Sequence, residues 1–195
     1  MLDSFQNADQ AITLFINSFH SQISDNIMQM FSNKYVWIPV YLFVVYMVFR
    51  RLGWKKGLAV VLSVVLAIVI CDQFSGLVKN YVDRLRPNYN SEMIRGQLHL
   101  LEVRTGYFGF FSGHATNAFC FAVCTIIGFR NDEKHTYNAY RTWVLIWAAF
   151  VSLSRVFVGK HYFGDILVGA GVGVLIGYCA GALCRHLIAK YLTEA

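Results

Sequence analysis

The chain has 195 residues, of which 56% are apolar and only 14% are charged, and its mean hydropathy is +0.46. This composition excludes an ordinary soluble domain, in which about a quarter of the residues are charged. The formal net charge is +6, but the bases gather at the ends of apolar runs and form no basic surface interleaved with aromatic side chains. We therefore expect anionic lipid as a partner, and no nucleic acid.

Residues 1–34 form the first segment, in which apolar side chains recur every three or four positions among Asp, Gln, Asn and Ser. These apolar side chains are Ala8, Ala11, Ile12, Phe15, Phe19, Ile23, Ile27 and Phe31. The spacing predicts an amphipathic helix, or a pair of helices, lying on the membrane surface. Packing of this segment on the protein's own bundle is an equally supported alternative.

Five apolar runs follow, over residues 35–49, 57–78, 108–129, 142–158 and 164–188. A backbone inside a bilayer must satisfy its amides within its own segment, so these runs predict helices. The first run is short for a hydrocarbon core about 30 Å thick. We expect an all-α integral membrane bundle in a single domain, residues 1–195, with about five transmembrane helices in residues 35–195.

The orientation follows from threading these runs alternately through the bilayer. One side then receives the bases of residues 50–56, 130–141 and 185–190. The other side receives the acidic amino-terminal segment and the loop at residues 91–107. The positive-inside rule places that second side on the extracytoplasmic face, in a bacterial inner membrane.

Three short polar motifs emerge together on this second side, each at the end of an apolar run. They read Lys79-x6-Arg86-Pro87, Phe111-Ser112-Gly113-His114 and Ser154-Arg155-x5-His161-x3-Asp165. A phosphoryl group in transfer needs cations and hydrogen-bond donors at its equatorial oxygens. Three cations, two histidines and one carboxylate are sufficient for phosphoryl transfer through a histidine.

The three cations are Lys79, Arg86 and Arg155. Arginine offers a planar pair of donors and lysine a compact charge, so this mixture suits a phosphate held from several sides. Considered without the other motifs, Lys79 is better explained as a lysine that snorkels from a helix end.

The second motif lies where an apolar run begins, and a helix start presents free amides to an anion. Ser112 is expected to cap the helix or to donate its hydroxyl, and Gly113 to let the backbone approach a phosphate. His114 then lies beside the anion. On its own, Ser-Gly-His is a weak signal.

The third motif contains the pair His161 and Asp165. A carboxylate four residues along a helix accepts the proton of one ring nitrogen and leaves the other nitrogen free, which makes a positioned nucleophile. Capping of the last helix is the structural alternative for Asp165.

Together the three motifs resemble the phosphatase signature of the type-2 phosphatidic acid phosphatase superfamily, which also includes vanadate-dependent haloperoxidases. All spacings match over residues 79–165, and the surrounding runs are similar to those of small bacterial members. Phe111 stands where the family usually has proline, which alters a helix entry rather than a reacting group. Haloperoxidase chemistry is disfavoured because those relatives are soluble.

The resemblance implies that His161 attacks phosphorus to give a phosphohistidine and that Asp165 orients its ring. His114 would protonate the leaving oxygen and then activate water, and no metal or other cofactor is expected. The groups implied to hold the phosphoryl oxygens are Lys79, Arg86, Arg155, Ser112 and the Gly113 amide.

We therefore expect a membrane-bound lipid phosphatase that hydrolyses a phosphate monoester or a terminal pyrophosphate phosphate. Undecaprenyl pyrophosphate, lipid A phosphate, phosphatidylglycerophosphate and phosphatidic acid remain open as substrates. One alternative is a lipid phosphotransferase, in which a lipid hydroxyl takes the phosphate from His161. The other is a non-catalytic transporter or scaffold for anionic lipid.

Two further features have open interpretations. Asp72 lies two helical turns before Lys79, and we hypothesise that it contacts Lys79 or another cation of the site; a polar bond to another helix is equally supported. Glycines at positions 169, 173, 177 and 181 form a stripe of small residues. We expect this stripe to pack inside a monomer, with a dimer seam as the less favoured alternative.

Overall fold

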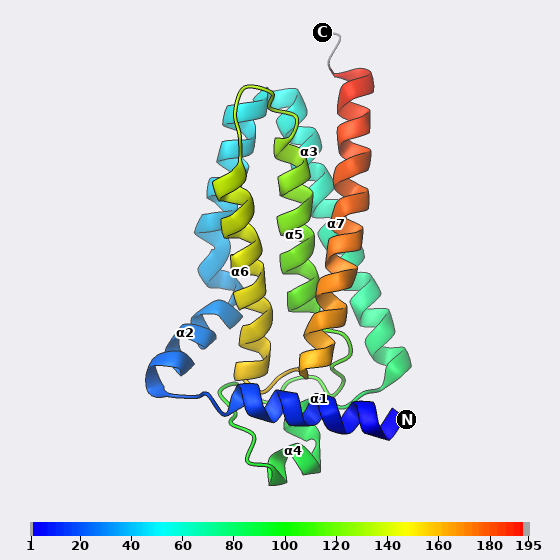
Figure 1. The fold of residues 1–195 in the computed structure, drawn as a ribbon. Helices are drawn as coiled ribbons and strands as arrows, with labels where there is room; N and C mark the ends of the chain where they lie inside the picture. The colour runs from blue at the N-terminus through cyan, green and yellow to red at the C-terminus, as the bar shows by residue number, and fades with distance from the viewer. Residues whose placement is uncertain (1, 193–195) are drawn as a thin grey trace.

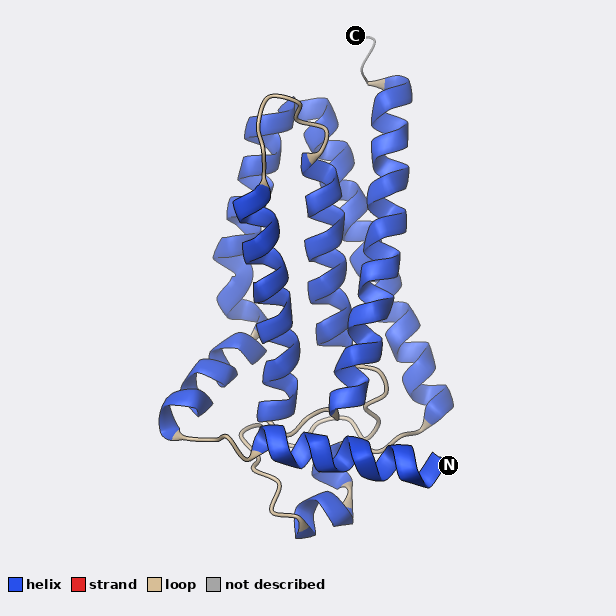
Figure 2. Ribbon diagram, viewed as in Figure 1, coloured by secondary structure: helices blue, strands red, loops and turns tan. Residues whose placement is uncertain are grey.

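The computed structural model describes residues 2–192, with side chains from residue 4. Helices and loops make up this part of the chain, with one isolated bridge between Leu85 and Phe108 and no strand (Figure 2). The long helices are α3 (Ile38–Val82), α5 (Gly113–Phe129), α6 (Asn138–Phe157) and α7 (Phe163–Tyr191). The shorter elements are α1 (Leu2–Asn17), α2 (Gln22–Ser32), α4 (Ser91–Arg95) and the 3-10 helices η1 (Lys34–Trp37) and η2 (Pro87–Tyr89).

Helix α3 is bent into two arms at Gly53, whose φ of 74° and ψ of 177° are not helical. Positive φ is accessible to glycine at little cost, so the chain can reverse here without a loop. The first arm rises and the second descends along the bundle (Figure 1). These arms correspond to the first two predicted runs, 35–49 and 57–78.

The structure confirms the all-α membrane fold. Two helical segments, 34–82 and 163–191, are long and apolar enough to cross a bilayer, and α5 is an apolar helix of 17 residues. The prediction that the third run is helical from residue 108 was wrong. Helix α5 begins at Gly113 because Ser112 takes an extended conformation and caps it. The number of transmembrane crossings stays a prediction.

Helix α5 is the centre of the bundle and packs against α3, α6 and α7. The glycine stripe of α7 faces it: a Cβ on Gly169 or Gly177 would lie 2.6 Å from the carbonyl oxygen of Ser112 or Cys120. The stripe therefore packs inside one chain, as predicted. Helix α5 covers these glycines, and the predicted monomeric state, with a dimer as the less favoured alternative, stays a prediction.

The amino-terminal segment forms the predicted pair of helices, and α1 lies across the lower end of the bundle in Figure 1. The side of α1 that faces the protein is polar, since Thr13 and Asn17 are buried there. Asn17 donates hydrogen bonds to the carbonyls of Val156 and Phe157 at the end of α6. The opposite side is apolar and open. The polar side of α1 therefore packs on the bundle, which confirms that alternative. Contact of its apolar side with lipid stays a prediction.

Candidate active site

The three motifs meet at the end of the bundle that α1 crosses (Figure 1). Lys79 lies in the last turn of α3, Arg155 in the last turn of α6 and Asp165 in the first turn of α7. Ser112 caps α5 at the same end and hydrogen-bonds through its amide to the carbonyl of Asp165, at 3.1 Å. Alternation of the spans predicted this convergence, and the geometry agrees with it.

His161 lies in the connection between α6 and α7 and is 2% exposed. Its Nδ1 is 3.4 Å from Oδ2 of Asp165, which also accepts the amide of Tyr162 at 3.1 Å. Asp165 therefore performs both predicted roles, contact with the histidine and capping of α7. Burial lowers the pKa of His161 from 6.5 to about 4, against the opposing effect of Asp165. The imidazole is consequently neutral at pH 7, and Nε2 is the nitrogen that does not face Asp165.

Arg84 is a member of this cluster that the sequence did not reveal. It donates to Oδ1 of Asp165 and to Oδ2 of Asp9, both at 2.7 Å. Its guanidinium carbon lies 3.9 Å from the centre of the Tyr162 ring. The available signal was a second arginine within the six unspecified positions of the first motif. No pattern in the sequence indicated Asp9, because it lies in α1, 75 residues before Arg84.

Lys79 donates a hydrogen bond to Ser75 Oγ at 3.0 Å, one helical turn back along α3. A Cβ on Gly113 would lie 3.1 Å from that oxygen and 3.5 Å from Lys79 Nζ. Glycine therefore lets the lysine approach the start of α5. The predicted approach of the Gly113 backbone to a phosphate stays a prediction.

Arg86 is the residue directly before η2. A backbone group holds its side chain in place, since Nε donates a hydrogen bond to the carbonyl of Phe108 at 3.0 Å. The absence of a side chain at Gly109 allows the cluster to close: a Cβ there would lie 3.0 Å from Arg86 Cγ and 3.2 Å from Asp165 Oδ2. The same position would be 3.5 Å from His161 Nδ1. Arg86 is thus packed beside the His161 and Asp165 pair.

Arg155 is 5% exposed, and its Nη1 contacts Ser32 and lies 3.3 Å from Oε1 of Glu102. Among the described residues, its Nε has no hydrogen-bond partner. Glu102 also lies 4.0 Å from Lys160, which is buried against the same loop. The loop before α5 therefore covers Arg155 with a carboxylate. Glu102 and Lys160 were not among the predicted site residues.

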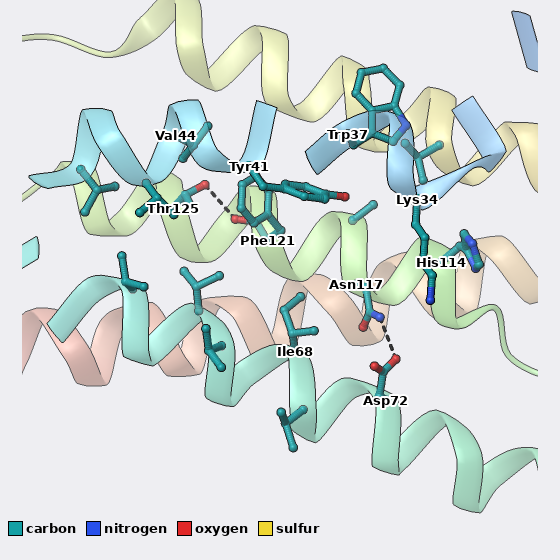
Figure 3. A pocket seen from close by; sticks show the side chains of 18 of the residues that line it. Lys34, Trp37, Tyr41, Val44, Ile68, Asp72, His114, Asn117, Phe121 and Thr125 are labelled. Atoms are coloured by element: carbon teal, nitrogen blue, oxygen red, sulfur yellow. Dashed lines mark hydrogen bonds between the residues drawn. The ribbon is translucent and has the colours of Figure 1, made fainter. Parts of the chain in front are cut away.

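His114 lies half-buried in the first turn of α5, where the charges of Arg155, Lys79 and Lys34 act on it. It lines one end of a cavity of about 500 Å³ between the two arms of α3 and α5. Figure 3 shows Lys34, Asn117 and His114 together at this end. The charged groups of the cavity are thus gathered beside the predicted acid.

Most of the remaining wall of the cavity is apolar, with Thr125 as a polar side chain at the far end (Figure 3). It is lined by Val44, Val48, Val60, Val64, Ile68 and Phe121, among others. At the polar end, Asn117 Nδ2 donates to Asp72 Oδ1 at 2.7 Å (Figure 3). Asp72 thus makes the interhelical bond that was one of its two predicted roles. Within the part of the chain that the structure describes, Asp72 forms no ion pair with Lys79, although its charge acts on that lysine at longer range. Its predicted role toward a cation of the site stays a prediction.

Comparison with known proteins assigns the family. Residues 56–190 match the family model of the PAP2 superfamily. The lipid A 4'-phosphatase of Bacteroides thetaiotaomicron is 30% identical over 196 residues, which cover 100% of this chain and 84% of that protein. The undecaprenyl-diphosphatase of Sulfolobus acidocaldarius is 33% identical over 76% of this chain and 63% of that protein.

A solved structure gives the same fold. The PAP2-type phosphatidylglycerolphosphate phosphatase of Bacillus subtilis superposes with a TM-score of 0.71 at 20% identity, over 96% of this chain and 88% of that one. The geometry at the motif end and the match over most of the sequence lead to one assignment: the chain belongs to the PAP2 superfamily and is a membrane lipid phosphatase, a hydrolase of phosphate ester or diphosphate bonds.

Proposed function

We propose that His161 is the nucleophile of this lipid phosphatase and that His114 is its acid and base. The observation that carries the proposal is the buried, neutral His161, with Nδ1 facing Asp165 and Nε2 left for phosphorus. An imidazole needs a free lone pair to attack and a carboxylate to stabilise the cation that it becomes. His161 has both in one place.

The reaction then proceeds in two displacements. Nε2 of His161 forms a bond to phosphorus while the bond to the leaving oxygen breaks, and a protonated His114 gives that oxygen its proton. Burial and the charge of Arg155 disfavour protonation of His114 in the free site, so the negative charge of the bound phosphate must offset them before His114 takes up this proton from water. In the second step His114 takes a proton from water, the water oxygen bonds to phosphorus, and the bond to Nε2 breaks. Phosphate leaves and His161 returns to its neutral form.

The oxygens of the phosphoryl group are held from several sides. Lys79 approaches from the last turn of α3, Arg86 from the loop that follows α3, and Arg155 from α6. Ser112 and the Gly113 amide approach from the start of α5. Nε of Arg155, which has no hydrogen-bond partner within residues 4–192, is a buried donor available to one oxygen. Glu102 lies on the same guanidinium, so an arriving phosphate displaces or rearranges this carboxylate.

The cavity supports an amphiphile as the substrate. In-line displacement puts the leaving group opposite the nucleophile, and the cavity opens beside His114 rather than His161. One hydrocarbon chain of the leaving lipid therefore fits between the arms of α3 and α5. Among the open substrates, we favour a lipid A phosphate, because the relative so named matches the whole chain. Undecaprenyl diphosphate is the second candidate, supported by the relative of that name.

We also propose that residues 1–195 act as one domain, in a monomer, with the site on the extracytoplasmic face of a bacterial inner membrane. The turn between the arms of α3 and the connection between α5 and α6 lie at the end opposite the site (Figure 1). Both carry clusters of lysine and arginine. The positive-inside rule puts that end in the cytoplasm.

The test is release of phosphate by the purified protein from lipid A, undecaprenyl diphosphate, phosphatidylglycerophosphate and phosphatidic acid. We expect turnover of at least one lipid, preferably lipid A, and its loss in His161→Ala. Wild-type turnover retained in that variant would overturn the assignment of the nucleophile. Recovery of a phosphorylated acceptor lipid in place of free phosphate would identify the phosphotransferase alternative.

A further inference from the structure

Arg84 links two carboxylates that come from opposite ends of the sequence. One is Asp165, which is fully buried, and the other is Asp9 of α1, which is 16% exposed at its side chain. Each is 2.7 Å from a different terminal nitrogen of the same guanidinium. Because that group is planar and rigid, fixing one nitrogen on Asp9 fixes the direction of the other toward Asp165.

The same carboxylate of Asp9 binds the start of α7. Its Oδ1 accepts the amide of Gly164 at 2.7 Å, and Thr13 Oγ1 accepts the amide of Phe163 at 3.0 Å. The first amides of a helix have no partner within the helix, so α1 supplies acceptors that α7 lacks. Close approach depends on Gly164, where a Cβ would lie 2.8 Å from Asp9 Oδ2.

The opposite side of α1 is exposed and apolar. Phe5 and Phe15 of α1 are 71% and 64% exposed, and Phe19, in the connection just after α1, is 60% exposed. In a membrane protein, this apolar side meets the lipid surface. One helix therefore contacts the bilayer with one side and the His161 and Asp165 pair, through Arg84, with the other.

We propose that Arg84 and Asp9 are positioning residues that hold Asp165 against the His161 ring, and that seating of α1 on the lipid surface thereby sets the rate of phosphate transfer. The inference rests on the proposed role of His161. Arg84 engages Oδ1 of Asp165, so Oδ2 is the oxygen that points to the imidazole. Without Asp9, one nitrogen of this partly exposed arginine loses its partner, and Asp165 loses its fixed orientation.

The first experiment measures kcat and KM of Asp9→Asn, Arg84→Lys and Arg84→Ala on a water-soluble phosphate ester. We expect kcat to fall by about a hundredfold in Arg84→Ala, the effect of misplacing a reacting group by about 1 Å, with KM little changed. Millimolar guanidinium should restore part of the activity of Arg84→Ala, and Arg84→Lys should retain more activity than Arg84→Ala. A residue with a merely structural role would show neither rescue.

The matched control is Asp83→Asn. Asp83 is the exposed neighbour of Arg84, and its φ of 52° suits asparagine. Melting temperatures of all variants in detergent separate misfolding from misplacement. Wild-type kcat in Asp9→Asn and Arg84→Ala, with His161→Ala inactive, would overturn this inference alone. Activity in His161→Ala would overturn the proposed function itself.

The second experiment compares detergent with vesicles of anionic phospholipid. A triple variant in which Phe5, Phe15 and Phe19 are replaced by Gln should have the kcat of the wild type in detergent. In vesicles its kcat should be about tenfold lower than that of the wild type, because α1 then docks incompletely on the lipid surface. Equal kcat of wild type and triple variant in vesicles would remove the coupling to the lipid surface.

Discussion

The motif end of the bundle and the cavity beside it recognise their ligands by different means. At the motif end, charged side chains are each held by partners from several elements, as Arg84 is by α1 and α7. In the cavity, valines of the two arms of α3 face a space of about 500 Å³ with few polar atoms. Charge fixed by hydrogen bonds selects a phosphate, whereas an apolar space selects a chain by size alone.

Among substitutions that test this contrast, we expect the largest loss of turnover at His114, which belongs to both regions. Replacing it with Gln should lower turnover of lipid phosphates by about 10² to 10⁴, the usual contribution of a general acid. With p-nitrophenyl phosphate the first step should suffer much less, because nitrophenolate leaves without a proton. Burst and steady-state kinetics on both substrates measure this. An equal loss of the first step on both would show that His114 does not protonate the leaving group.

The buried His161 of the motif end should make the stability of the protein depend on pH. Burial lowers the pKa of His161 to about 4 in the folded protein, so between pH 6.5 and 4 the unfolded chain binds a proton that the folded protein does not. Stability therefore falls as the pH falls through this window, by about 1.4 kcal/mol for each pKa unit and by about 3 kcal/mol in all.

Thermal unfolding in detergent from pH 7 to 4 measures this loss, and His161→Gln should be less sensitive to acid than the wild type. Parallel curves for the two proteins would contradict a neutral buried His161.

A change confined to the cavity should affect only substrates with a long chain. Val64→Phe fills part of the space, and we expect kcat/KM for long-chain lipid phosphates to fall by about tenfold with no change on a soluble phosphate ester. Val174→Phe, at an exposed valine of α7, is the matched control. A loss of the same size on the soluble ester would mean that the cavity and the motif end are not separable.

The smallest effect is expected at Asp72, where the two regions meet. Asp72→Asn keeps an acceptor for Asn117, so turnover should stay within about twofold and stability within about 1 kcal/mol, the usual size of a polar bond between membrane helices. Phosphate release and melting temperature test this. A large loss of turnover at unchanged melting temperature would give the charge of Asp72 a direct role at Lys79.

The sequence predicted the motif end better than the cavity for a physical reason. Alternating spans must bring Lys79, Ser112 and His161 to one face, whatever the details of packing. Arg84 was missed because it lies between two motif residues and its partner Asp9 is far away in sequence. The valines of the cavity could not be identified because a valine that faces lipid and one that faces a cavity have the same periodicity.

The contact between the glycine stripe and α5 has a consequence for genetics. Ser112 and Asp165 are joined at the motif end by a single backbone hydrogen bond, and the alignment of their two helices is set further along by Gly169 and Gly177. A methyl group added at Gly177 separates α5 from α7 and moves His114 away from His161. A screen for loss of phosphatase activity should therefore recover alanine substitutions in the middle of the bilayer, at positions that never meet the substrate.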